Sequence, residues 1–130
     1  MSHLDRVDLD GVELEYELRG AGDAVVLVHA GVCADFFEPL REEPALADRH
    51  RLLRYHRVGY AGSGSVDGSV SIADQAAHCG VLMRHLGVGR AHVVGHSSSA
   101  TIALQLALDA PDLVRTLALL DAARPAPRTD

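Results

Sequence analysis

The spacing of apolar residues along this chain follows two periods, one typical of strands and one typical of helices. Strict alternation of apolar and polar residues predicts half-buried strands, whereas a continuous apolar run predicts a strand buried on both faces, as in a parallel sheet. By these criteria we expect strands over residues 4–8, 12–18, 25–28, 91–94 and 113–120. Asp10-Gly11 lies between the first two strands and is typical of a tight hairpin turn.

Helical patterns occupy the segments between these strands. The first expected helix is short because Pro39 and Pro44 limit its length. The second has a capping residue at its start, Ser71, and a glycine at its end, Gly87. We expect helices over residues 36–46, 71–86 and 100–108. This order of elements predicts an α/β fold in which an N-terminal hairpin is followed by a mostly parallel sheet, strands 1 to 6, with flanking helices.

The length of 130 residues allows one hydrophobic core and is too short for two typical domains. We expect residues 1–122 to form the N-terminal part of a core domain. The tail over residues 123–130 combines two prolines with charged and small residues, and we expect it to be disordered.

The segment from Gly95 to Ser99 reads Gly-His-Ser-Ser-Ser and lies between an expected strand and an expected helix. Strand, sharp turn and helix in this order are typical of a nucleophile elbow, whose pattern is G-x-S-x-G. Gly95 and Ser97 match the pattern, and Ser99 replaces the last glycine. Ser97 is therefore the candidate nucleophile. The same residues are also typical of a serine-rich helix N-cap, so both interpretations stay open.

Two segments upstream of Gly95 carry related motifs. The buried run over residues 25–28 is followed by His29-Ala30-Gly31, and residues 54–63 contain Gly59 and Gly62 before Ser63. In this order the three segments resemble the α/β-hydrolase superfamily, in which a central strand ends in His-Gly-x and strand 4 is followed by Asp-x-Arg-Gly-x-Gly-x-Ser. Gly59 and Ser63 match; the departures are Ala30 for glycine, His56 for aspartate, Val58 for arginine and Ala61 for glycine.

The resemblance implies particular roles for four residues. Ser97 is the nucleophile, and the backbone N–H groups of Gly31 and Ser98 form the oxyanion hole. The superfamily order is serine, then acid, then histidine. Asp121 follows an expected strand and stands where some members carry the acid; it is otherwise a strand-end aspartate that orders the next turn. Every histidine precedes Ser97.

These observations lead to two hypotheses. The first is a serine hydrolase, esterase-like or acting on carbon-carbon bonds, present only as its N-terminal half and inactive as it stands because the catalytic histidine is missing. Its substrate would be a small ester or related acyl compound, with no cofactor and no metal. The second is a non-catalytic hydrolase-like module that associates through the exposed edge of strand 6, and self-association through that edge is expected in either case.

Charge and composition exclude other partners. The formal net charge of −6 disfavours binding to nucleic acid or to an anionic membrane surface. The glycines at 59, 62 and 64 suggest a phosphate cradle, but their spacing is G-x-x-G-x-G and not G-x-G-x-x-G. The first residues turn acidic at once and no apolar run is long enough to cross a bilayer, so we expect a cytoplasmic location.

Overall fold

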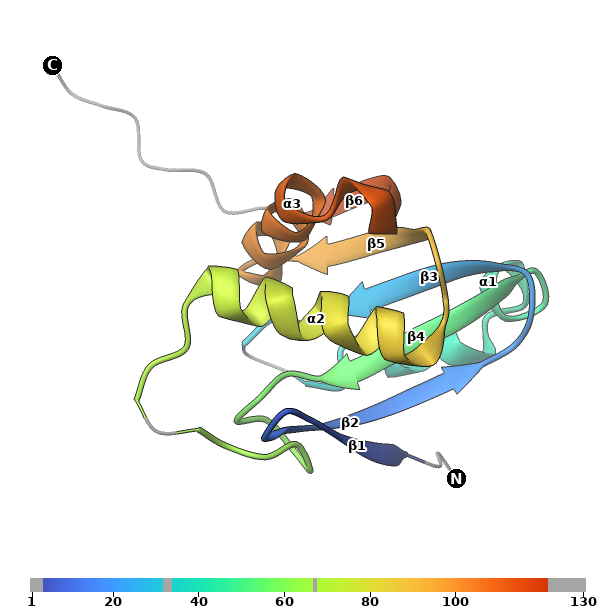
Figure 1. The fold of residues 1–130 in the computed structure, drawn as a ribbon. Coiled ribbons are helices and arrows are strands. Elements are labelled where there is room, and N and C mark those ends of the chain that lie inside the picture. Colours follow the sequence, from blue (N-terminus) through green and yellow to red (C-terminus); the bar gives the residue numbers. More distant parts are fainter. Residues whose placement is uncertain (1–3, 32–33, 67, 122–130) are drawn as a thin grey trace, which may run out of the picture.

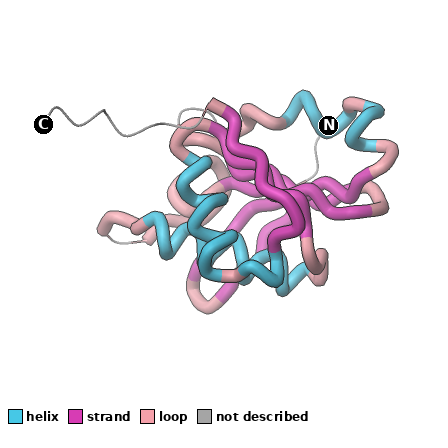
Figure 2. The backbone as a smooth tube through the Cα atoms, turned by 90° about the horizontal axis from the view of Figure 1, so that it is seen from above, coloured by secondary structure: helices cyan, strands magenta, loops and turns pink. Residues whose placement is uncertain are grey.

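The fold is built on one six-stranded sheet that contains antiparallel and parallel strand pairs, with helices on both of its faces (Figures 1 and 2). The structure is a computed structural model and describes residues 4–31, 34–66 and 68–121. The strands are β1 (Asp5–Leu9), β2 (Val12–Arg19), β3 (Asp23–Val28), β4 (His50–His56), β5 (Ala91–His96) and β6 (Val114–Leu120). The helical segments are η1 (Glu38–Glu42), α1 (Pro44–Ala47), α2 (Ile72–Leu86), α3 (Ser99–Asp109) and η2 (Pro111–Leu113).

The strand order in the sheet is β1-β2-β4-β3-β5-β6. The β1–β2 and β2–β4 pairs are antiparallel, and the β4–β3, β3–β5 and β5–β6 pairs are parallel. Asp10 (φ 54°) and Gly11 (φ 88°) both adopt the positive φ that a two-residue hairpin turn requires. The predicted fold class, an N-terminal hairpin followed by a mostly parallel sheet, is confirmed.

Each face of the sheet has its own hydrophobic core. The larger core lies under α2 and α3, where Leu82 and Met83 of α2 and Ile102 of α3 pack against Val26 and Leu53 of the central strands. The smaller core lies under η1 and α1; it is formed by Val25, Leu27, Phe37 and Leu52, with Leu40, Leu46 and Val94 packed against them. The central strands β3 and β4 are therefore buried on both sides, as the continuous apolar run over residues 25–28 predicts for β3.

Helix α2 has the ends that its sequence predicts. The Ser71 hydroxyl accepts a hydrogen bond from the Asp74 N–H at 3.0 Å, and Gly87 ends the helix with a left-handed φ of 63°. The expectation of one helix over residues 36–46 is wrong, because the segment forms the separate pieces η1 and α1. Glu43 between them is extended (φ −70°, ψ 116°), which is the conformation that the following Pro44 favours.

Strand β6 is the last element of the described part of the chain and lies at an edge of the sheet (Figure 1). Leu119 and Leu120 near its end are 39% and 45% exposed. The tail predicted over residues 123–130 lies outside the described residues. Among those residues, no helix combines the length and apolar character needed to cross a membrane.

Candidate active site

The turn from β5 into α3 holds Ser97 in a strained backbone conformation. Its φ is 52°, in the left-handed region that residues other than glycine rarely adopt. The Ser97 N–H donates to the carbonyl of Leu120 at 2.8 Å, and its carbonyl accepts from the Ala100 N–H at 3.1 Å. A strained backbone at the motif serine is typical of a nucleophile elbow, and Ser97 lies at the carboxyl ends of β5 and β6.

Gly95 allows β5 and α3 to approach each other closely. A Cβ atom at this position would lie 2.8 Å from both the Cα of Ala100 and the carbonyl oxygen of Ser99, and 3.0 Å from the Cβ of Ala103. These contacts are shorter than van der Waals separation, and two of them involve backbone atoms. The first glycine of the motif is required by packing.

Ser99 occupies the position of the last motif glycine and is fully buried. Its hydroxyl accepts from the His96 N–H at 2.7 Å and lies within donor distance of two carbonyl oxygens, those of Val28 (2.6 Å) and His96 (2.9 Å). Serine can therefore replace glycine at this position without leaving a buried polar group unsatisfied. Ser99 is inaccessible to a substrate.

Gly31 lies at the same edge of the sheet as the turn after β5. Its N–H donates to the Ser98 hydroxyl at 3.2 Å. A Cβ on Gly31 would lie 2.9 Å from the hydroxyl oxygen of Tyr60, so a larger residue there would displace that side chain. The Ser98 hydroxyl makes no capping bond to α3. Ser98 is the N-cap residue of α3 by position, but its side chain contacts the loop after β3 instead of the helix.

His29 connects the Gly31 loop to the end of β4. Its Nδ1 lies 2.8 Å from the Ala30 carbonyl, and its Nε2 accepts from the Arg57 N–H at 2.8 Å. The Arg57 guanidinium donates to the His29 carbonyl at 2.9 Å and lies over the Tyr60 ring, 4.9 Å from its centroid. Burial, and then the positive charge of Arg57, lower the pKa of His29 to about 4. His29 is therefore a neutral structural residue.

Asp121 follows β6 at the edge of the sheet where Ser97 lies. The preceding residue, Leu120, pairs with His96 and accepts the Ser97 N–H bond. Asp121 has a φ of 48° and is exposed. The expected placement of Asp121 beside the turn is therefore observed, while its role stays a prediction.

An aromatic pair next to the turn was not identified from the sequence. The ring of Phe36 stacks on that of His96, with centroids 4.1 Å apart and planes inclined by 8°. Phe36 is 46% exposed. The buried Nδ1 of His96 has no hydrogen-bond partner among the described residues. Phe36 thus presents an apolar ring to solvent beside the residue that precedes Ser97.

Two carboxylates surround His56, the last residue of β4, which stands where the superfamily motif has aspartate. His56 Nδ1 lies 2.6 Å from Glu15 Oε1, and His56 Nε2 lies 2.7 Å from Asp35 Oδ1. The Gly62 N–H donates to Glu15 Oε1 at 3.1 Å. Because a carboxylate already occupies this loop amide, the loop is unsuited to bind a phosphate. The unusual histidine at position 56 was the signal in the sequence, but nothing in the sequence identified its partners.

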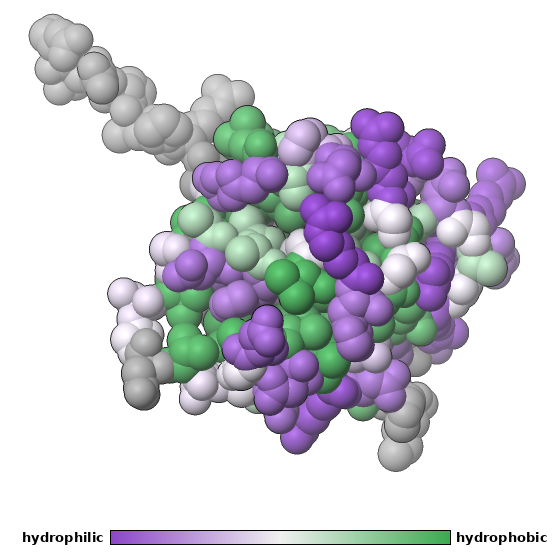
Figure 3. Space-filling view, in the orientation of Figure 1, coloured by the Kyte–Doolittle hydropathy of each residue, from purple (hydrophilic) through white to green (hydrophobic). Residues whose placement is uncertain are grey.

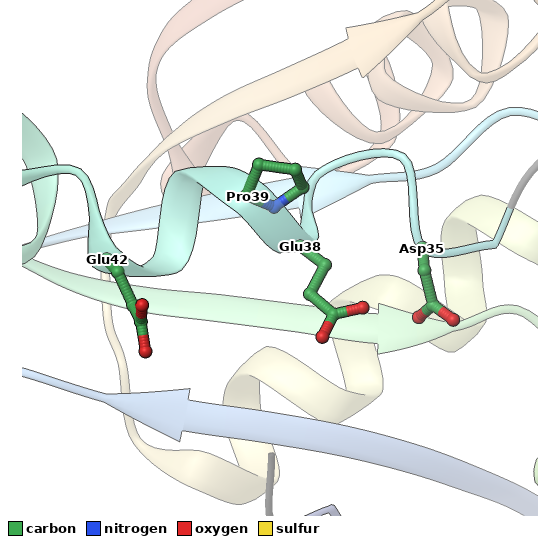
Figure 4. Close-up of a pocket in the computed structure, with 4 residues that line it drawn as sticks. All are labelled: Asp35, Glu38, Pro39 and Glu42. Carbon is green, nitrogen blue, oxygen red and sulfur yellow. The ribbon is translucent and has the colours of Figure 1, made fainter. Parts of the chain in front are cut away.

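A hollow of about 350 Å³ lies along η1 and is lined by Asp35, Glu38, Pro39 and Glu42 (Figure 4). The three carboxylates in Figure 4 point to the same side of the segment, toward β4. This acidic hollow therefore disfavours anionic ligands. Within the part of the chain that the structure describes, no three His, Cys, Asp or Glu side chains are arranged to hold a metal ion.

Comparison with known proteins gives consistent relatives. The chain is 37% identical over 110 residues to a putative carbamate hydrolase RutD of Azorhizobium caulinodans, covering 84% of this chain and 41% of that protein. It is 33% identical over 120 residues to a fluoroacetate dehalogenase of Burkholderia sp., covering 88% and 39%.

Solved structures show the same relationship. A hydrolase from Pseudomonas aeruginosa superposes with a TM-score of 0.83 at 29% identity, covering 92% of this chain and 46% of that one. A thermophilic esterase from Thermogutta terrifontis gives a TM-score of 0.84 at 26% identity, covering 97% and 48%. The chain thus spans less than half the length of these relatives. Residues 23–130 match the family described as alpha/beta hydrolase fold, and the chain belongs to this family.

Proposed function

We propose that this chain is the nucleophile-bearing part of a serine hydrolase that transfers an acyl group from a small ester-like or carbamate-like substrate to water. Ser97 supplies the attacking hydroxyl, and the N–H groups of Gly31 and Ser98 bind the negative charge that develops on the carbonyl oxygen. Asp121 is the acid that orients a histidine. No residue of this arrangement requires a cofactor.

The observation that carries the proposal is the strained turn at Ser97. A positive φ at a residue other than glycine costs about 1 kcal/mol or more, and such strain clusters at functional sites. Here it coincides with the motif serine, and the Gly31 N–H lies within hydrogen-bond distance of the neighbouring Ser98. A serine at this position also disfavours the chemistry of enzymes that attack with an aspartate, a difference from the fluoroacetate dehalogenase relative.

The histidine that would take the proton from Ser97 is not among the 130 residues, since none follows His96. Without this general base the hydroxyl is a weak nucleophile, and loss of the base in a serine protease costs on the order of 10⁶ in turnover. We therefore propose that residues 1–130 alone do not hydrolyse esters.

The test uses the complete open reading frame that encodes these residues, treated with a fluorophosphonate probe that labels activated serines. Ser97→Ala should abolish labelling. Thr101→Ala is the matched control, because Thr101 carries an exposed hydroxyl on the first turn of α3 and takes no part in the proposed site, and it should still label. Labelling that survives in Ser97→Ala, or that disappears only in Thr101→Ala, would refute the assignment of Ser97.

The exposed edge of β6 supports a second candidate function, a non-catalytic module that pairs with another chain through this edge. Its backbone groups face away from β5, and Leu119 and Leu120 are partly exposed beside them. This candidate predicts that the complete open reading frame shows no Ser97-dependent labelling, whereas substitutions along β6 change its association.

A further inference from the structure

The end of β4 holds both ends of the loop that carries Gly31. At the first end, the backbone N–H and the guanidinium of Arg57 bind the side chain and the carbonyl of His29. At the second end, His56 Nε2 lies 2.7 Å from Asp35 Oδ1, and Arg54 donates to the same oxygen at 3.1 Å. Because His56 and Arg57 are consecutive, one short segment of β4 fixes the loop on either side of Gly31.

The His56 ring links two carboxylates from different parts of the chain. Each ring nitrogen lies within hydrogen-bond distance of a carboxylate oxygen, Nδ1 with Glu15 and Nε2 with Asp35. Glu15 and His56 are paired residues of β2 and β4, so the ring is anchored to the sheet on one side and to Asp35 on the other.

The surrounding charges compensate for the burial of this group. His56 is 3% exposed, and Glu15, Glu17 and Arg54 are each below one tenth exposed. Arg54 pairs with Glu17 at 3.3 Å, and Arg6 approaches Glu15 at 3.8 Å. The hydrogen bond from His56, followed by the charge of Arg54, lowers the pKa of Asp35, so Asp35 is ionised at neutral pH.

We infer that Asp35 and His56 are positioning residues, and that their charge-assisted bond holds the Gly31 N–H in place as an oxyanion donor. This inference rests on the proposed function for its catalytic meaning, but the position of Gly31 can be measured without catalysis. His56 stands where the superfamily motif has aspartate, and the carboxylates of Glu15 and Asp35 surround it. The chain thus uses an imidazole between two carboxylates at this point.

The test measures hydrogen exchange of the Gly31 amide by NMR in Asp35→Ala. The Asp35 side chain is 52% exposed, so the variant should keep its fold. Exchange at Gly31 should become faster by about tenfold, the effect of losing one charge-assisted hydrogen bond, while exchange at the buried Val26 amide stays unchanged. Asp48→Ala is the matched control: Asp48 lies in the same connection between β3 and β4, and its side chain makes no hydrogen bond or ion pair with a described residue.

A second variant tests the hydrogen bond itself. Asp35→Asn keeps a side-chain oxygen that can accept from the His56 ring, so exchange at Gly31 should stay closer to the parent than in Asp35→Ala. Gly31 exchange in Asp35→Ala that matches Asp48→Ala, or equal exchange in both Asp35 variants, would overturn the inference. Failure of the proposed function has a different signature: probe labelling would then persist in Ser97→Ala, whatever the exchange at Gly31 shows.

Discussion

The close approach of β5 and α3 can be tested by adding a single methyl group at Gly95. In Gly95→Ala the new Cβ would meet the backbone of Ser99 and Ala100 at 2.8 Å, and neither atom can move without displacing the start of α3. Overpacking of a core typically costs 1–3 kcal/mol, and rigid backbone neighbours favour the upper end. We therefore expect the free energy of unfolding to fall by about 3 kcal/mol.

Gly80 provides the matched control for this substitution. It is also buried, but a Cβ there would make ordinary contacts with side-chain atoms, 3.4 Å from Leu106 Cδ1 and 3.5 Å from Leu113 Cδ1. Gly80 lies inside α2, where alanine is favoured over glycine by about 1 kcal/mol. Gly80→Ala should therefore leave the free energy of unfolding unchanged or raise it by up to about 1 kcal/mol.

Urea unfolding followed by circular dichroism distinguishes the two variants. With a slope of about 1.5 kcal/mol/M, the midpoint of Gly95→Ala should fall by about 2 M, and that of Gly80→Ala should not fall. Equal midpoints for the two variants would show that α3 does not lie as close to β5 as the structure places it.

Three further predictions concern pH, catalysis and association. Because burial lowers the pKa of His29 to about 4 from an ordinary 6.5, its neutral form stabilises the fold fully above pH 6.5. This contribution, on the order of 3 kcal/mol, should be lost as the pH falls from 6.5 to 4, and NMR titration of the ring should show its midpoint. In a protein that labels at Ser97, Asp121→Asn should lower turnover by about 10⁴, so a loss of only a few-fold would place the acid elsewhere. Size-exclusion chromatography of residues 1–130 should show species larger than the 13.8 kDa monomer, and Leu119→Lys should shift them to monomer.

Local sequence signals were sufficient for much of the fold. The hairpin at Asp10-Gly11 and the ends of α2 depend on residues close together in the chain, and apolar runs identified the buried strands β3 and β5. The sequence of β4 carries no such run, and only the motif at its end marked it. The break at Glu43 was missed because the helical pattern of residues 36–46 was given more weight than the restriction that Pro44 imposes on the residue before it. Both outcomes follow from local backbone chemistry.

The candidate site was predictable only where a motif marks it. The turn at Ser97 and the position of Gly31 followed from motif order, whereas the partners of His56 did not. Glu15 lies 41 residues before His56 and Asp35 lies 21 residues before it. The pairing of β2 with β4 brings Glu15 beside His56, and Asp35 reaches the ring from the connection between β3 and β4. Contacts of this kind depend on tertiary register, which spacing along one chain does not reveal.

The exposure of apolar residues on α2 and α3 could not be predicted from local sequence signals either. Figure 3 shows apolar side chains among the polar ones on the face that these helices cover. Val81 on α2 and Leu104 and Leu108 on α3 are 47%, 44% and 69% exposed. Helical periodicity assigns such residues to a core, but the crossing of the two helices decides which of them it covers.

The buried hydroxyl of Ser99 changes what a sequence pattern for this turn should require. Glycine is usual there because the strand and the helix leave little space, yet serine fits because its oxygen bonds to backbone groups of His96 and Val28. The requirement is therefore a residue small enough for the space between the strand and the helix, and any polar atom that it adds must find hydrogen-bond partners at that depth. Serine meets both conditions, and valine is too large. A search restricted to glycine would miss chains like this one, and one that admits serine but excludes valine would find them.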